Sequence, residues 1–254
     1  MSAAPLVRRA LAEFLGTGLL VTVVVGSGIM ATRLTPDVGI QLLANSIATA
    51  LGLAVLILMF GAVSGAHFNP AVSLVDWFLG RRRRVGLSAP ALGIYTLAQI
   101  AGAVGGAVLA NVMFAVPTSL STTDRATPAT LVAEVVATFG LVLLIVALAR
   151  TGRGAAAAPA VGAYIGAAYW FTSSTSFANP AVTIGRLFSD TFAGIGASSV
   201  LPFIGAQLAG AAVAVLAAVL LFPHVTDAAE EIVIPKLDAD PDASAVHRRD
   251  RPAP

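Results

Sequence analysis

Residues 68–74 read Phe-Asn-Pro-Ala-Val-Ser-Leu, and residues 177–184 read Phe-Ala-Asn-Pro-Ala-Val-Thr-Ile. Proline is tolerated at the first position of a helix, where its missing N–H is no loss, and asparagine is a favoured N-cap. Each stretch therefore predicts the start of a helix, with an asparagine at or next to the cap. The six motif residues are Asn69, Pro70, Ala71, Asn179, Pro180 and Ala181.

The segments around both motifs are apolar but too short to cross a bilayer. They cover residues 62–79 and 172–189, whereas a crossing helix needs about 20 residues. Irregular backbone at membrane depth is tolerated only where it is buried in protein or lines a cavity. We therefore predict two re-entrant segments, each an irregular descent to the midplane followed by a half-helix that returns to the same side.

The composition places the whole chain in a bilayer. Of its 254 residues, 57% are apolar and 11% are charged, and the mean hydropathy is +0.88. This leaves too little polar surface to cover a soluble globule. The predicted fold is an all-α membrane protein with six spans, the first a retained helix. They cover approximately 9–30, 39–61, 89–115, 129–149, 155–175 and 196–222.

The two halves of the chain repeat the same marks in the same order. Ala-Glu-x-x-x-Thr occurs at 12–17 and at 133–138, and Ala-Gln-x-x-Gly occurs at 98–102 and at 206–210. Because each half holds an odd number of spans, the second must be inverted relative to the first. The predicted division is a cytoplasmic N-terminus at 1–8, repeats at 9–115 and 129–222, an external loop at 116–128, and a disordered cytoplasmic tail at 223–254.

The basic residues predict the orientation. With the N-terminus in the cytoplasm, only three of the 15 Lys and Arg residues lie outside: Arg33, Arg125 and Arg186. The Arg81–Arg84 run is expected to anchor the topology at anionic lipid, not to bind nucleic acid.

Cysteine is absent, which excludes disulfides and thiol chemistry. No nucleophile or phosphate-binding motif appears, so we expect a plasma-membrane protein with no enzymatic activity and no cofactor.

Two half-helices that enter from opposite faces would bring their N-termini together at the midplane. Each presents about half a positive charge and free N–H donors. The carboxamides of Asn69 and Asn179 add donors that orient a passing hydroxyl, so that it does not relay protons. The pattern indicates a pore that repels cations and passes neutral hydroxylic solutes.

These motifs also carry a resemblance. Together with Ser-Gly-Ala-His-Phe at 64–68, the paired Glu marks and the Ala-Gln-x-x-Gly helices, they resemble the aquaporin and glycerol-facilitator family, the major intrinsic proteins. The resemblance spans about residues 6–222. It implies a passive channel, a homotetramer with one pore per subunit, and buried structural roles for Glu13 and Glu134.

Several other polar residues lie within the predicted spans or the first re-entrant segment. Glu13 and Glu134 raise the possibility of proton coupling, but their symmetric places at helix starts favour buried acceptors for the N–H groups of the re-entrant loops. Gln99 and Gln207 are interpreted as interhelical hydrogen-bonding residues. His67 either lines the cytoplasmic half of the pore or makes a hydrogen bond within its loop, and no metal site is expected.

The chain departs from the family after the second motif. Members usually carry Arg at that position, and glycerol-type members Asp next, whereas this chain has Val182 and Thr183. Without an aromatic residue, His or Arg, the constriction is predicted to be wider than that of a strict water channel. By the family's spacing its residues are Ser176, Val182, Ala167, and either Thr49 or, with a gap, Leu51.

Arg186 lies one helical turn beyond Val182. Because helix side chains lean toward the N-terminus, it could reach back over the pore mouth. The alternative is an arginine that snorkels at the outer interface and pairs with Asp190.

Two functional hypotheses follow. The first is a passive channel for water, glycerol-like polyols and metalloid hydroxides. Val182 and the Ser- and Thr-rich loop at 171–177 resemble a bacterial branch associated with arsenite permeation, and arsenous acid is neutral at pH 7 and similar to glycerol in its hydroxyl pattern. The alternative is a proton-coupled secondary transporter with an inverted repeat that uses Glu13 or Glu134 as the proton carrier.

Overall fold

The computed structural model describes residues 4–81 and 86–222, and every regular element within them is a helix. The predictions for residues 82–84 and for the tail at 223–254 lie outside the described residues. The elements are α1 (Leu6–Leu34), α2 (Val38–Ser64), α3 (Pro70–Gly80), α4 (Ala89–Met113), α5 (Pro128–Arg150), η1 (Gly154–Ala156), α6 (Ala157–Phe171), α7 (Pro180–Arg186) and α8 (Ala197–Leu221).

Five of the described helices are long and apolar enough to cross a membrane, namely α1, α2, α4, α5 and α8. They occupy five of the six predicted spans, and the all-α membrane architecture is confirmed. The remaining span, 155–175, was predicted too long at its C-terminal end. The helix in this segment, α6, has 15 residues and is about 22 Å long. It ends at Phe171 because the chain turns into the second re-entrant loop.

The two short helices α3 and α7 begin at the prolines of the two motifs. Asn69 and Asn179 are the N-caps, both with extended backbone, and each side chain accepts a hydrogen bond from the first turn of its helix. The distances from Oδ1 are 2.9 Å to the nitrogen of Ala71 and 3.0 Å to that of Ala181. The capping amide thereby satisfies one of the helix donors that has no intrahelical partner.

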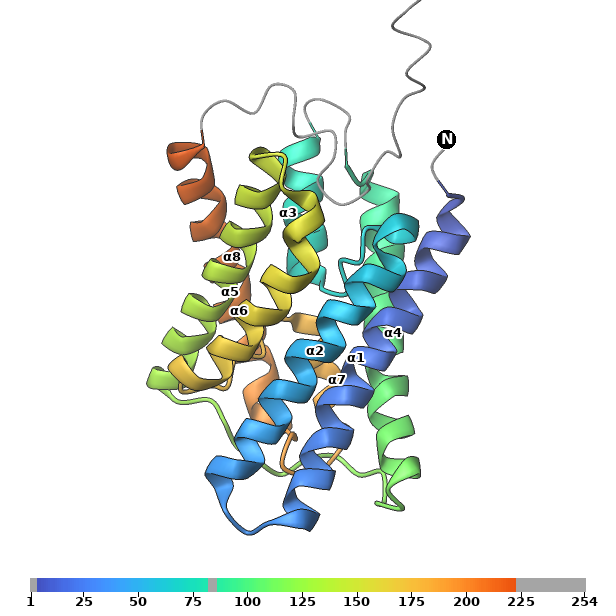
Figure 1. Ribbon diagram of the computed structural model, residues 1–254, viewed down its shortest axis with the longest axis vertical. Coiled ribbons are helices and arrows are strands. Elements are labelled where there is room, and N and C mark those ends of the chain that lie inside the picture. The colour runs from blue at the N-terminus through green and yellow to red at the C-terminus, as the bar shows by residue number, and fades with distance from the viewer. Residues whose placement is uncertain (1–3, 82–85, 223–254) are drawn as a thin grey trace, which may run out of the picture.

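The long helices pack in equivalent pairs, α1 on α4 and α5 on α8. Glycine permits the close approach in both pairs. A Cβ at Gly102 would lie 2.2 Å from the carbonyl oxygen of Phe14, and one at Gly210 would lie 2.4 Å from that of Val135. Figure 1 shows α1 running downward from the labelled N-terminus and α5 running upward. The equivalent helices of the two halves therefore point in opposite directions.

The described chain begins and ends at the same end of the bundle. Figure 1 shows the start of α1 and the end of α8 there, together with the end of α3 and the start of α4. The loops that join α1 to α2 and α4 to α5 lie at the opposite end.

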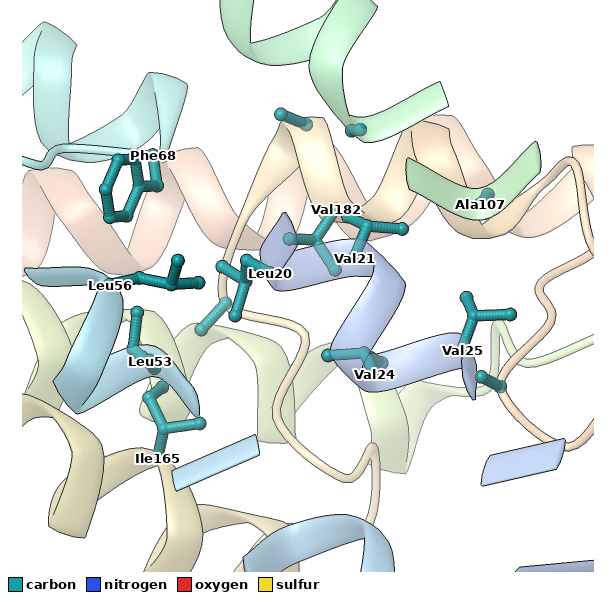
Figure 2. Packing of buried hydrophobic residues seen from close by; sticks show 14 of the residues in the cluster. Leu20, Val21, Val24, Val25, Leu53, Leu56, Phe68, Ala107, Ile165 and Val182 are labelled. Carbon is teal, nitrogen blue, oxygen red and sulfur yellow. The ribbon is translucent and has the colours of Figure 1, made fainter. Parts of the chain in front are cut away.

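Apolar side chains from both halves meet in the middle of the bundle. Leu20 of α1, Leu53 of α2, Ile165 of α6 and Val182 of α7 belong to one buried cluster, in which Phe68 of the first re-entrant loop also packs (Figure 2). The two re-entrant segments are thus held inside the bundle, and their helix starts lie at its centre.

Candidate functional site

The two re-entrant loops are joined at the centre by a reciprocal pair of hydrogen bonds. Asn69 Nδ2 donates to the carbonyl oxygen of Ala178 at 2.8 Å, and Asn179 Nδ2 donates to that of Phe68 at 2.7 Å. Each amide nitrogen carries two protons, so one N–H of each remains for another acceptor. The crossed bonds hold the starts of α3 and α7 next to each other.

Glu13 of α1 holds the first loop by hydrogen bonds. Its Oε1 accepts from the Ser64 hydroxyl at 2.6 Å and from the backbone N–H of His67 at 3.0 Å, and its Oε2 accepts from the N–H of Phe68 at 2.7 Å. Gln99 Nε2 donates to the same Oε2 at 2.7 Å and to Ser73 Oγ at 3.0 Å. The carboxylate therefore satisfies loop N–H groups that have no helix or sheet partner.

Glu134 of α5 makes the equivalent contacts to the second loop. Its two oxygens accept from the N–H groups of Phe177 and Ala178, each at 2.9 Å. Gln207 Nε2 donates to Glu134 Oε2 at 2.6 Å and to Thr183 Oγ1 at 2.8 Å. Both glutamates are fully buried, at 0% exposure.

Both loops have backbone conformations that are costly for residues other than glycine. A positive φ at such a residue costs on the order of 1–3 kcal/mol and persists only where the surroundings enforce it. The enforcing contacts here are the glutamate and asparagine bonds. The strained residues are Ala66 and Phe68 in the first loop and Thr175, Ser176 and Ala178 in the second.

One cavity runs along the inside of the bundle past both asparagines. Leu20, Val24, Leu53 and Ile165, which Figure 2 shows converging from α1, α2 and α6, form part of its apolar wall. The cavity continues to Ala149 and the start of η1 in one direction and to the level of α7 in the other. Both halves of the chain contribute to its lining.

The structure places three of the expected constriction residues in this wall: Thr49, Ser176 and Val182. It contradicts the other two. Leu51 is 64% exposed and Ala167 is also exposed, and neither lines the cavity.

The helical period explains both errors. On α2 the lining residues Thr49, Leu53 and Ile57 recur every four positions, which puts Leu51 on the opposite face. On α6 the lining residues are Ala157, Val161, Ile165 and Tyr169. Tyr169, and not Ala167, is therefore the residue near the end of α6 that lines the cavity, so the wall contains an aromatic side chain that the spacing did not predict.

Arg186 also lines the cavity and is 3% exposed. Its Nε donates to the carbonyl oxygen of Ala193, and its Cζ lies 3.4 Å from the ring centroid of Phe177. This burial does not fit the predicted alternative, an arginine that snorkels at the outer interface and pairs with Asp190; the carboxylate of Asp190 accepts instead from the backbone N–H of Thr122 at 3.0 Å. A guanidinium thus faces the cavity although position 182 is valine.

Arg125, in the loop before α5, was predicted only as an external basic residue and not as part of the site. Its Nε donates to the carbonyl oxygen of Gly194 at 2.6 Å and one terminal nitrogen to that of Phe192 at 2.8 Å. Its Cζ lies 5.5 Å from the centroid of the Phe177 ring. Burial lowers the pKa of Arg125 from its ordinary value, but arginine remains charged in proteins. Within the described part of the chain, neither Arg125 nor Arg186 donates a hydrogen bond to a carboxylate.

His67 fits both of its predicted descriptions. It lines the cavity, and its Nδ1 lies 3.0 Å from Ser73 Oγ. Among the described residues, no group of three or more His, Asp or Glu side chains is placed to hold a metal ion.

Comparisons with known proteins agree with this geometry. The family model described as "Major intrinsic protein" matches residues 1–177, ending just before the second Asn-Pro-Ala motif. Aquaglyceroporin AqpS of Rhizobium meliloti (strain 1021) is 52% identical over 207 residues, which cover 81% of this chain and 86% of that protein. The chain belongs to the major intrinsic protein family. The resemblance drawn from the motifs is thereby confirmed.

Other relatives support the same family and fold. The propanediol uptake facilitator PduF of Citrobacter freundii is 34% identical over 110 residues, or 42% of this chain and 37% of that protein. The X-ray structure of the aquaglyceroporin from Plasmodium falciparum superposes with a TM-score of 0.61 at 21% identity, covering 88% of this chain and 98% of that one. The chain therefore has the helical membrane fold of a major intrinsic protein.

Proposed function

We propose that this major intrinsic protein is a passive membrane channel for water and small neutral polyhydroxyl solutes. The observation that carries the proposal is the reciprocal bonding of Asn69 and Asn179 in the wall of one cavity that both halves line. Each amide keeps one N–H for a solute oxygen. The adjoining helix starts and Arg186 supply positive potential, which opposes the entry of cations and protons.

The cavity wall suits a solute that is partly apolar and rich in hydroxyls. Leu20, Leu53 and Ile165 provide apolar surface, and Asn69 and Arg186 provide N–H donors. Among the described lining residues there is no Asp or Glu, so a cation would lose its hydration without gaining a carboxylate. A glycerol-like polyol matches both surfaces, because it has C–H groups on one side and hydroxyls that donate and accept.

Two solutes are the leading candidates. Glycerol agrees with the name of the relative from Rhizobium meliloti, an aquaglyceroporin. Arsenous acid is neutral at pH 7 and presents a similar set of hydroxyls, so a pore that passes glycerol has little means of rejecting it.

The test is stopped-flow light scattering on vesicles that contain the purified protein. Water, glycerol, urea and arsenous acid are compared with protein-free vesicles of the same lipid. We expect water and glycerol to move down their gradients faster than in the protein-free vesicles. We expect arsenous acid to permeate faster than in the protein-free vesicles as well, as glycerol does. Rates equal to those of protein-free vesicles for all four solutes would refute the channel.

The transporter alternative finds no support in the site. Glu13 and Glu134 are fully buried, do not line the cavity, and use both oxygens to accept bonds from the loops. Proton exchange with a passing solute would require one of them to leave those bonds.

We also propose that both termini are cytoplasmic, that residues 9–115 and 129–222 are the two inverted repeats, and that the chain forms a homotetramer in the plasma membrane. The distribution of arginines supports the orientation. The lining of the cavity by both halves of one chain supports one pore per subunit.

A further inference from the structure

A pair of buried hydroxyls lies in the cavity wall between α2 and α6. Thr49 Oγ1 and Tyr169 Oη are 3.1 Å apart, and both residues line the cavity. Neither hydroxyl has another hydrogen-bond partner in the described part of the chain. Whichever of the two donates, the other keeps its proton, and both oxygens retain acceptor capacity. The pair can therefore still donate to and accept from a solute.

A third hydroxyl in the same wall lacks a partner. Ser176 lines the cavity with a buried side chain, and its Oγ makes no hydrogen bond to any described residue. Its backbone is held at a φ of 52°, in the loop that Glu134 anchors. Buried polar groups in native proteins nearly always have a partner. A solute in the cavity is a partner of the right chemistry.

We propose that Tyr169 is a specificity-determining residue of this channel, and that its hydroxyl, paired with Thr49 and acting with Ser176, binds the hydroxyl groups of permeating polyols. The inference rests on the proposed function and deepens it. The family's spacing places Ala167 at this point, so the site is a property of the α6 register in this chain.

The physical role of the site is to replace water. A polyol that enters the cavity gives up hydration, and the remaining O–H and the free lone pairs of the Tyr169–Thr49 pair compensate for part of that loss. A water molecule needs fewer hydrogen bonds than a polyol, and Asn69, Asn179 and Arg186 can supply them in its place. Loss of the Tyr169 hydroxyl should therefore slow polyols more than water.

The test is the substitution Tyr169→Phe, which removes one oxygen and keeps the ring. The matched control is Tyr164→Phe on the same helix, because Tyr164 does not line the cavity and its hydroxyl donates to the carbonyl oxygen of Ala137 at 3.0 Å. Glycerol and water permeabilities are measured on the same vesicle preparations. We expect Tyr169→Phe to lower the ratio of glycerol to water permeability about five-fold, the effect of one neutral hydrogen bond, and Tyr164→Phe to leave it unchanged.

A second variant, Thr49→Val, keeps the shape of the side chain and removes the other hydroxyl. We expect it to lower the same ratio, and the double variant to lower it by less than the product of the two single effects, because the hydroxyls act as a pair. An unchanged ratio in Tyr169→Phe, or an equal fall of glycerol and water permeability, overturns the proposal. These outcomes presuppose that the parent conducts glycerol. Parent rates equal to those of protein-free vesicles would instead refute the proposed function.

Discussion

The guanidinium of Arg186 stacks on the ring of Phe177, with Cζ 3.4 Å from the ring centroid. The stack and the bond from Nε to the carbonyl oxygen of Ala193 hold a buried charge at the cavity wall one turn beyond Val182. A desolvated cation–π contact contributes about 2 kcal/mol or more. The arginine is therefore fixed in place and does not extend to the membrane surface.

Removal of this charge should open the pore to cations. We expect Arg186→Ala to raise the cation conductance of reconstituted vesicles about ten-fold or more, because a unit charge some 4 Å away contributes several kcal/mol at a protein-like dielectric. Arg186→Lys is the matched control. It keeps the charge but loses the planar stack, and it should restore most of the barrier to cations. Equal conductance in the parent and Arg186→Ala would show that the arginine plays no part in ion exclusion.

Val182→Arg should place a second guanidinium in the wall. It narrows the cavity and supplies fixed donors, so glycerol and arsenous acid permeability should fall further than water permeability. In this background Arg186→Ala should have little effect on cation conductance, because the new arginine supplies the missing charge. If water and glycerol were slowed to the same degree, Val182 could not line the selective part of the pore.

The glutamates offer a test of stability. Glu134→Gln replaces an acceptor oxygen by an NH₂ group facing the loop donors, and one buried donor left unpaired costs about 1–3 kcal/mol. We expect a lower midpoint of thermal unfolding in detergent, and the same for Glu13→Gln, its equivalent in the first half. A normal midpoint combined with the loss of pH-driven solute accumulation would favour the transporter instead.

Much of the fold could be predicted because its signals are local. The prolines at 70 and 180 mark the starts of α3 and α7, and the length of the apolar segments predicted the five long helices. The constriction could not be read from spacing alone, because the second loop contains left-handed residues and α6 ends at Phe171. The four-residue repeat from Val161 through Ile165 to Tyr169 was a usable signal for the lining face.

The position of Arg125 beside the site could not be predicted from the sequence. Its partners, the carbonyl groups of Phe192 and Gly194, are about 70 positions away in the sequence. Neither periodicity nor a motif marks it, since its role depends on how the loop before α5 lies on the loop after α7. Contacts of this type require the tertiary structure.

We propose that Asn69 and Asn179 form the barrier to cations and protons at the middle of the pore. Asn179→Asp would set a carboxylate against the Phe68 carbonyl oxygen that the amide now contacts at 2.7 Å, and would offset the positive potential of the helix starts. The control is Asn45→Asp, the same change at a buried amide of α2 that does not line the cavity.

The decisive measurement is proton conductance and glycerol permeability on the same reconstituted vesicles. We expect Asn69→Asp and Asn179→Asp to raise proton conductance and to lower glycerol permeability, and Asn45→Asp to leave proton conductance unchanged. Unchanged proton conductance in both motif variants, at normal protein content, would contradict it.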